Sequence, residues 1–146
     1  MTNRPAVKLY SPALLGLATE LSHFPLTQTL ELRAEARSRS CGSVITIGLT
    51  LGADDTVSQI GMQVSACAIG QASAALMARS AVGAAPSAIT MTTAAISRWL
   101  AGEGDLPDWP ALELVAPALA HPGRHGALLL PWKAACEALS HTSGSR

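Results

Sequence analysis

The clearest pattern in the chain is an alternation of apolar and charged residues from Thr29 to Arg37. Leucine or alanine occupies every second position of this stretch, and glutamate or arginine lies between them, which predicts a strand with one solvated face. The alternation repeats from Val44 to Leu51, Gly52 to Asp55 supplies turn residues, and apolar residues alternate again around Met62. These stretches predict three antiparallel strands.

After Cys67 the apolar residues recur at spacings of three and four, which is typical of a helix. Helical segments of this kind end at a proline, a glycine or a polar loop. They are Leu9 to Leu21, a segment that follows Cys67 and ends before Gly83, about Ser87 to Gly102, Leu112 to Leu119, and a last helix that contains Leu128 to Leu139. Ser87 is expected to cap the third segment. Gly102 to Pro110 and His121 to Gly126 are expected to be loops.

The order of these elements predicts an α+β fold. A three-stranded antiparallel sheet cannot cover its own apolar face, so we expect the helices to pack on one face of the sheet. The 146 residues are enough for one sizeable core. We therefore expect a single domain over residues 1–146, with a frayed tail at 141–146.

Composition narrows the classes of function. Charged residues make up only 14% of the chain, against about 25% in an average protein, so the surface suits protein partners or a homodimer. Ten basic and ten acidic residues cancel with no block of either sign, which argues against binding to nucleic acid or to an anionic membrane. No stretch approaches the roughly 18 to 20 apolar residues of a membrane-spanning helix, and no secretory signal is visible. Three cysteines in such a chain suggest a reducing, cytoplasmic location.

Cys41 and Cys67 are expected to lie side by side, because their positions are centred on the predicted turn between the second and third strands. Cys67 also begins a helix, where free backbone N–H groups and the helix dipole stabilise a thiolate as a ligand or nucleophile. Thiolates bind iron, zinc and iron–sulfur clusters, but such sites normally have three or four ligands, so two thiols supply half a site. Cys136, near Trp132 on an apolar helix face, is interpreted as a packing residue.

The common catalytic motifs are missing from the sequence. There is no Gly-rich phosphate loop, no G-x-S-x-G, no H-E-x-x-H and no C-x-x-C. We therefore expect a protein that is not an enzyme.

Several separated motifs resemble those of the iron–sulfur cluster assembly scaffolds of the NifU/IscU/SufU type. They are Tyr10 in the first helix, Cys41-Gly42-Ser43, Cys67-x-Ile69-x-x-Ala72-Ser73, Pro122-x-Arg124-x-x-Ala127, and Leu130-Pro131-Trp132-Lys133. The resemblance covers nearly the whole chain, and the Cys67 segment and the last segment are most similar to the SufU-type branch. It implies the fold of that family and protein partners, namely a cysteine desulfurase that supplies sulfur and apo-proteins that accept the product.

The resemblance also implies a ligand set of which this chain keeps only a part. The family has an aspartate two residues after the first cysteine and a third cysteine five residues after the proline, and these positions are Ser43 and Ala127 here. A serine hydroxyl is a poor ligand for iron or zinc, and alanine is none. IscU-type members have a histidine at the position of Gly126. His125 or His121 is therefore either a substitute nitrogen ligand from the same loop or a residue exposed to water.

These observations favour an iron–sulfur cluster assembly scaffold-like protein that binds iron, a cluster or zinc through Cys41 and Cys67. The remaining ligands are expected from His125, from an exogenous thiol, or from the same two cysteines of a second subunit. The alternative is a degenerate family member that acts as a protein-binding module without cluster chemistry, because two of the expected ligand positions are changed. A third hypothesis makes Cys67 a sulfur acceptor that works without any metal.

Overall fold

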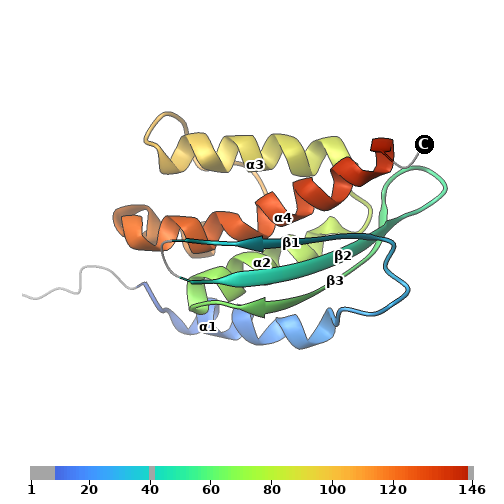
Figure 1. Ribbon diagram of the computed structural model, residues 1–146. Coiled ribbons are helices and arrows are strands. Elements are labelled where there is room, and N and C mark those ends of the chain that lie inside the picture. The colour runs from blue at the N-terminus through green and yellow to red at the C-terminus, as the bar shows by residue number, and fades with distance from the viewer. Residues whose placement is uncertain (1–8, 40–41, 145–146) are drawn as a thin grey trace, which may run out of the picture.

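The computed structural model of the protein describes residues 9–39 and 42–144. The strands form one antiparallel sheet in the order β1-β2-β3, so the predicted α+β fold is confirmed (Figure 1). In chain order the elements are α1 (Pro12–Thr19), η1 (Glu20–His23), β1 (Leu32–Arg37), β2 (Val44–Leu51), β3 (Val57–Ser65), α2 (Ala68–Ala81), α3 (Pro86–Leu100), η2 (Leu112–Ala120), η3 (Pro122–Arg124) and α4 (His125–Gly144), where η marks a 3₁₀ helix.

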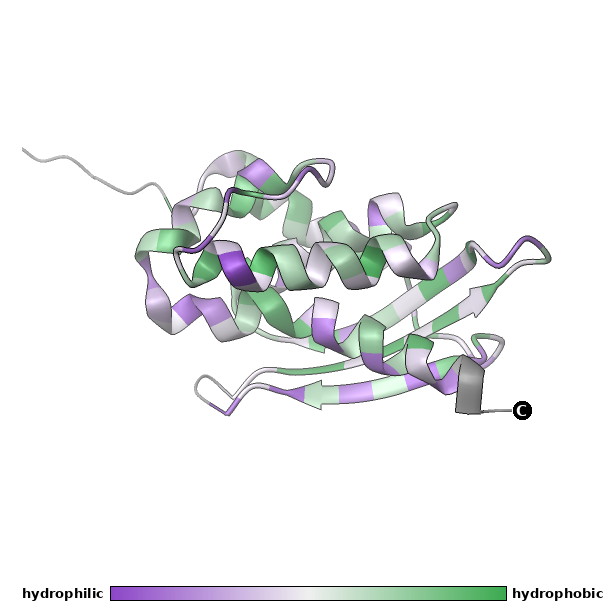
Figure 2. Ribbon diagram, turned by 90° about the horizontal axis from the view of Figure 1, so that it is seen from above, coloured by the Kyte–Doolittle hydropathy of each residue, from purple (hydrophilic) through white to green (hydrophobic). Residues whose placement is uncertain are grey.

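The alternation in the sequence becomes the two faces of this sheet. Ile47 of β2 lies between Ala34 of β1 and Met62 of β3, and all three side chains are buried. The residues that alternate with them, such as the exposed Glu35, project from the other face. Figure 2 shows this change between hydrophobic and hydrophilic residues along the strands. The apolar face is the one that the helices cover.

Two helices pack directly on the sheet. Helix α4 packs against β1 and β2, and α2 packs against β3. Helix α3 packs on α4 as an outer layer, and α1 packs on α2 (Figure 1). The prediction of helices on one face of the sheet is therefore confirmed for α2 and α4. No helix among the described residues is long and apolar enough to span a bilayer.

A buried network of hydrogen bonds fixes α2 against α4. Ser73 Oγ of α2 donates to the carbonyl oxygen of Leu128 at 2.7 Å and accepts from Trp132 Nε1 at 3.0 Å. The Trp132 ring meets Trp109 edge to face, with ring centroids 4.9 Å apart, and Trp109 Nε1 donates to the carbonyl oxygen of Leu76 at 3.0 Å. Ser73 and Trp132 are fully buried, so these bonds hold the start of α4 at a defined place on α2.

The segment before β1 crosses the outer face of the sheet, and β1 begins at Leu32, later than the alternation predicts. The amide of Met62 donates to the carbonyl oxygen of Phe24 at 2.9 Å. A β-carbon at Gly61 would overlap the carbonyl oxygen of Pro25. Glycine at this position of β3 therefore lets the crossing segment lie directly on the strand.

Boundaries in the second half of the chain also differ from the prediction. Ala85, and not Ser87, is the N-cap of α3, because Pro86 takes the first helical position, where its missing N–H has no intrahelical partner to lose. The region 121–126, predicted as a loop, forms η3 and the first turn of α4. Helix α4 continues through Gly144, past the predicted start of the tail.

Two segments that the sequence predicts as short helices contain 3₁₀ helix in the structure. Ser11 caps α1, where its side-chain oxygen accepts from the Leu14 amide at 3.1 Å, and the chain passes into η1 after Thr19. The segment predicted as a short helix from Leu112 is a 3₁₀ helix that contains Pro117. Proline removes one backbone donor, which disfavours a continuous α-helix there.

Candidate functional site

A cavity of about 350 Å³ lies at the end of the sheet where β1 leads into β2 and β3 leads into α2. It is open to solvent, and its walls come from three separate parts of the chain. The lining residues are Gly42, Ser43, Ser65, Ala66, Cys67 and Arg124. The cavity therefore brings together a thiol, a guanidinium group and two hydroxyl groups.

Cys67 is the N-cap of α2, in agreement with the helix start that the change of period predicts. It is a free, half-buried thiol. Its carbonyl oxygen accepts a hydrogen bond from the amide of Gln71 at 3.0 Å, which begins the helix. No side chain in the described part of the protein caps this end, and no acidic residue lies in the first turn of α2. The free N–H groups of a 14-residue helix thus stabilise negative charge near Cys67.

Cys41 lies outside the described residues, so its proximity to Cys67 stays a prediction. Its covalent neighbour Gly42 lines the cavity and has a φ of 73°, a left-handed conformation that glycine adopts without strain. The amide of Ser38 donates to the carbonyl oxygen of Ser43 at 2.9 Å, and the amide of Gly42 donates to that of Ser38 at 2.9 Å. These two bonds hold Gly42 and Ser43 next to Ser38, at the cavity.

Arg124 is a cavity residue that sequence reasoning did not single out as part of the site. Its Nε donates to the hydroxyl oxygen of Tyr10 at 3.2 Å, which joins η3 to the segment before α1. None of the described residues that line the cavity carries a carboxylate, so Arg124 gives the cavity a positive character. The available signal in the sequence was that Tyr10 and Arg124 both belong to the motifs shared with the scaffold family.

Neither His121 nor His125 adds a donor atom to the lining of the cavity. Nε2 of His125 lies 3.1 Å from the carbonyl oxygens of Ala118 and Leu119, which only accept hydrogen bonds, so Nε2 carries the proton and is not a free ligand. Nε2 of His121 is buried and has no hydrogen-bond partner among the described residues. Metal binding by His125 stays a prediction, and it would require Nδ1.

The two positions at which the resemblance implies further ligands hold none of the expected groups. Ser43 lines the cavity and is 3% exposed. Ala127 is 1% exposed and packs close to Gly70 of α2. Across residues 9–39 and 42–144, no group of three or more histidine, cysteine, aspartate or glutamate side chains is placed to hold a metal ion.

Cys136 lies in the contact between α3 and α4. Its Sγ is 3.3 Å from Oγ1 of Thr93 on α3, and the side chain is half-buried. This position agrees with the interpretation of Cys136 as a packing residue rather than a ligand.

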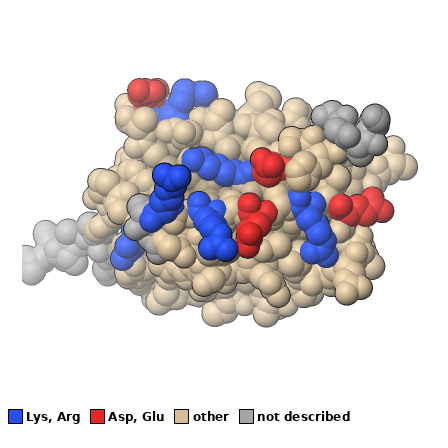
Figure 3. All heavy atoms as spheres, viewed as in Figure 1, with Lys and Arg blue, Asp and Glu red and all other residues tan. Residues whose placement is uncertain are grey.

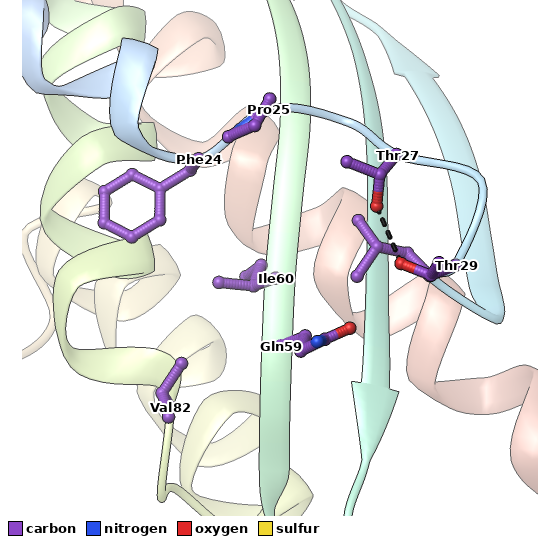
Figure 4. A pocket seen from close by; sticks show the side chains of 8 residues that line it. Phe24, Pro25, Thr27, Thr29, Gln59, Ile60 and Val82 are labelled. Carbon is purple, nitrogen blue, oxygen red and sulfur yellow. Dashed lines mark hydrogen bonds between the residues drawn. The ribbon is translucent and has the colours of Figure 1, made fainter.

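A second cavity, of about 360 Å³, lies between the segment before β1, strand β3 and the end of α2. Figure 4 shows Phe24, Ile60 and Val82 around it, with Thr27 and Thr29 hydrogen-bonded to each other at 2.9 Å. Its described lining has no cysteine, histidine or charged side chain. It therefore offers no group for thiol or metal chemistry, and the Cys67 cavity is the candidate functional site.

No protein-family model matches this chain, and no curated protein matches it. Among solved structures, the N-terminal part of a nitrogen-fixing NifU-like protein from Brucella abortus has a TM-score of 0.87 and 26% identity, over 94% of this chain and 96% of that one. A candidate iron–sulfur cluster assembly scaffold protein for the SUF system from Fervidobacterium islandicum AW-1 has a TM-score of 0.76 and 19% identity, over 87% of this chain and 93% of that one.

The two likenesses agree with the motifs in the sequence. The second shows the fold alone, and the first adds sequence similarity over nearly the whole chain. A nearer relation to the SufU-type branch stays a prediction. The chain therefore has the fold of these NifU-like and SUF-system proteins, and its motifs resemble those of the NifU/IscU/SufU type.

Proposed function

We propose that this protein is an iron–sulfur cluster assembly scaffold that binds iron or a cluster at the Cys67 cavity and passes it to apo-proteins. The observation that carries the proposal is that Gly42, the covalent neighbour of Cys41, lines the same cavity as Cys67. We expect the thiolates of both cysteines to bind one cargo, as the symmetric placement of Cys41 and Cys67 about the β2–β3 turn predicts.

The charge of the cavity favours a thiolate-bound cluster over a bare metal ion as the cargo. A cluster ligated by thiolates carries a net negative charge, whereas a ferrous or zinc ion is a cation that the guanidinium group of Arg124 repels. The N-terminus of α2 acts in the same direction. We therefore expect the cavity to retain an assembled cluster more tightly than iron or zinc alone.

Two cysteines leave two ligand positions of a cluster to be filled. An exogenous thiol, or the same two cysteines of a second subunit in a homodimer, would supply thiolates for them. His125 is the less suitable donor, because its Nε2 is bound to the carbonyl oxygens of Ala118 and Leu119. A homodimer would bring four thiolates to one cluster, which is the usual ligand number.

The proposed partners are proteins. A cysteine desulfurase would supply sulfur, and apo-proteins would accept the finished cluster. Free thiolates persist in a reducing compartment, so we place this activity in the cytoplasm.

The test is anaerobic reconstitution with ferrous iron and sulfide, followed by the absorption spectrum and the iron count. We expect a cluster spectrum in the native chain, its loss in Cys41→Ser and in Cys67→Ser, and its retention in Cys136→Ser. Cys136 is the matched control, because it is a half-buried thiol that lies in the α3–α4 contact. Well under one iron per native chain would contradict the proposal.

A second function is favoured by one observation, the presence of Ser43 and Ala127 where the resemblance implies ligands. A degenerate scaffold would keep its binding to protein partners and lose cluster chemistry. In that case a variant with both Cys41 and Cys67 replaced by serine would bind a cysteine desulfurase with the affinity of the native chain, measured by titration calorimetry. A large loss of affinity in the same variant would count against the binding module.

A further inference from the structure

Basic side chains surround the end of the sheet at which Cys67 lies. Arg37 is the last residue of β1 and pairs with Val44 of β2, which in turn pairs with Ser65 of β3. Paired residues project from the same face of a sheet, so Arg37 shares the outer face with Ser65, which lines the cavity. Two strand spacings separate Arg37 from Ser65, or about 10 Å.

Two further arginines complete this group. Arg39 is exposed and follows Ser38, whose carbonyl oxygen accepts a hydrogen bond from the amide of Gly42 at the cavity. Arg124 lines the cavity itself, with its Nε bound to the hydroxyl oxygen of Tyr10. We call Arg37, Arg39 and Arg124 together the basic rim.

A carboxylate lies beside the basic rim at Arg37. Arg37 pairs with Glu35 of its own strand at 3.8 Å, and both side chains are more than half exposed, so this pair contributes little. Arg39 forms no ion pair with a described residue. Figure 3 shows several Lys and Arg side chains on this face, with Asp and Glu side chains among them. Asp54 and Asp55 lie in the β2–β3 turn at the opposite end of the sheet.

Apolar surface adjoins the basic rim at Arg124. Tyr10 is 44% exposed, and its hydroxyl oxygen accepts from Arg124. Leu119 is 41% exposed, and its carbonyl oxygen lies 3.1 Å from Nε2 of His125, the residue after Arg124. A small free anion would contact the guanidinium groups alone, whereas a protein segment covers charged and neighbouring apolar side chains together. The surroundings of the basic rim therefore suit a protein segment.

We propose that the basic rim is a docking surface for an acidic segment of a partner protein, which it brings to Cys67. This inference rests on the proposed function in one respect, that the partner exchanges sulfur or a cluster at Cys67. The span of about 10 Å between Arg37 and Ser65 corresponds to about three residues of extended chain, so the segment carries carboxylates on more than one residue. The positive potential at the N-terminus of α2 also attracts carboxylates, at the cavity itself.

The first test measures docking itself in the full chain without iron. A fluorescent Glu-rich peptide is titrated with the protein by anisotropy, and the same peptide with Gln in place of Glu is the control ligand. We expect the Glu-rich peptide to bind more tightly, with an affinity that falls as ionic strength rises. Arg37→Glu and Arg39→Glu should each weaken binding by roughly tenfold. Arg98→Glu is the matched control, because Arg98 is an exposed arginine in the last turn of α3.

The second test measures the potential at Cys67 through its reactivity, in a chain with Cys41→Ser and Cys136→Ser. The Cys67 thiolate attacks a small disulfide, forms a mixed disulfide and releases the other half of the probe as a thiolate. We expect dianionic dithiobis-nitrobenzoate to react faster than cationic cystamine, relative to the rates of the same two probes with free cysteine, by about tenfold at low salt. Arg124→Gln should remove most of this preference, and circular dichroism checks that the variant is folded.

Several outcomes would overturn the inference. One is equal binding of the Glu and Gln peptides, and another is unchanged binding in both Arg37→Glu and Arg39→Glu. Binding of free glutamate as tight as that of the peptide would show an anion site instead of a docking surface. A native dimer that dissociates in Arg39→Glu would show that the acidic segment belongs to a second copy.

Both tests use iron-free protein, so a failure of cluster assembly leaves their results unaffected. Cluster assembly without docking would overturn this inference alone.

Discussion

A β-carbon built on Gly70 would lie 3.3 Å from the β-carbon of Ala127, so the first turn of α2 and the start of α4 are in direct contact there. Gly70 is three residues after Cys67, and residues at that spacing on a helix are neighbours. Ala127 thus lies beside the end of α2 at which the thiol is placed. The packing of Ala127 on Gly70 therefore helps to fix the N-terminus of α2, where Cys67 lies, against α4.

We predict that Gly70→Ala destabilises the protein, because the new β-carbon would also lie 2.8 Å from the β-carbon of Ala66. Overpacking of this kind typically costs about 1–3 kcal/mol, and the helix preference of alanine returns about 1 kcal/mol of it. Urea unfolding measures the difference. Gly16→Ala in α1 is the control, since nothing lies within 4 Å of a β-carbon there, and it should stabilise the protein by about 0.5–1 kcal/mol. Equal effects of the two variants would contradict the contact.

We predict that Ser73→Ala lowers the free energy of unfolding by about 1–3 kcal/mol. The change removes the acceptor of the buried Trp132 Nε1–H and leaves that donor without its partner. Ser80→Ala is the matched control, because Ser80 is a half-buried serine on the same helix with no hydrogen bond recorded for its side chain in the described chain. Its effect should stay within about 0.5 kcal/mol. A similar loss in both variants would show that the Ser73 network is not the cause.

We predict that Ala127→Cys combined with Ser43→Asp increases the iron bound per chain after anaerobic reconstitution. The two changes place a thiol beside Gly70 and a carboxylate in the lining of the cavity, which would complete a four-ligand set with Cys41 and Cys67. The readouts are the iron count and the cluster absorption per chain.

The control for this prediction is Ala135→Cys combined with Ser43→Asp. Ala135 is as deeply buried on α4 as Ala127, but it lies eight residues further on, about 12 Å along the helix axis. The control should bind no more iron than Ser43→Asp alone. If both cysteine variants gained iron equally, the position of Ala127 beside Gly70 would not be the cause.

We predict a pH effect at the β2–β3 turn. Hydrogen bonds from the side chain and then from the amide of Thr56 hold the pKa of Asp54 below its ordinary value of 3.8. The charged carboxylate is favoured in the folded state, so its stabilising contribution is present above the unfolded pKa and is lost as the pH falls through the folded pKa. Carboxyl carbon NMR shifts measure the titration. Thr56→Val, which keeps a β-branched side chain, should raise the pKa of Asp54 towards 3.8, and an unchanged midpoint would contradict the assignment.

The strands and the beginning of α2 were predictable because they depend on local order in the sequence. An alternation of period two has a single buried face, so Val44–Leu51 agrees with the prediction at both ends. The change of period after Cys67 marks the start of α2 in the same way. The N-terminal part of the predicted first strand failed because the chain there is held on the outer face of β3 by the contact between Met62 and Phe24. That contact joins residues far apart in the sequence.

The candidate site was predictable in part. Cys67 could be placed at a helix start, because its position depends on the residues that follow it. Arg124 could not be placed beside it, because its hydrogen bond to Tyr10 joins residues 114 positions apart and has no periodic signal. The positions of His121 and His125 depend on how η2 and η3 fold back on the start of α4, and the sequence alone suggested exposure or ligation.

The sequence by itself determined the order and type of the main elements, the single buried face of the sheet and the family resemblance, because each of these is set by spacing and by residue type. The tertiary structure alone decided which helices touch the sheet, that Ala127 packs against Gly70, and that Arg124 shares a cavity with Cys67. These relationships depend on side chains that meet only after α2 and α4 pack together through Ser73 and Trp132. Packing of that kind follows from shape and buried hydrogen bonds between distant segments, and no local pattern in the chain encodes it.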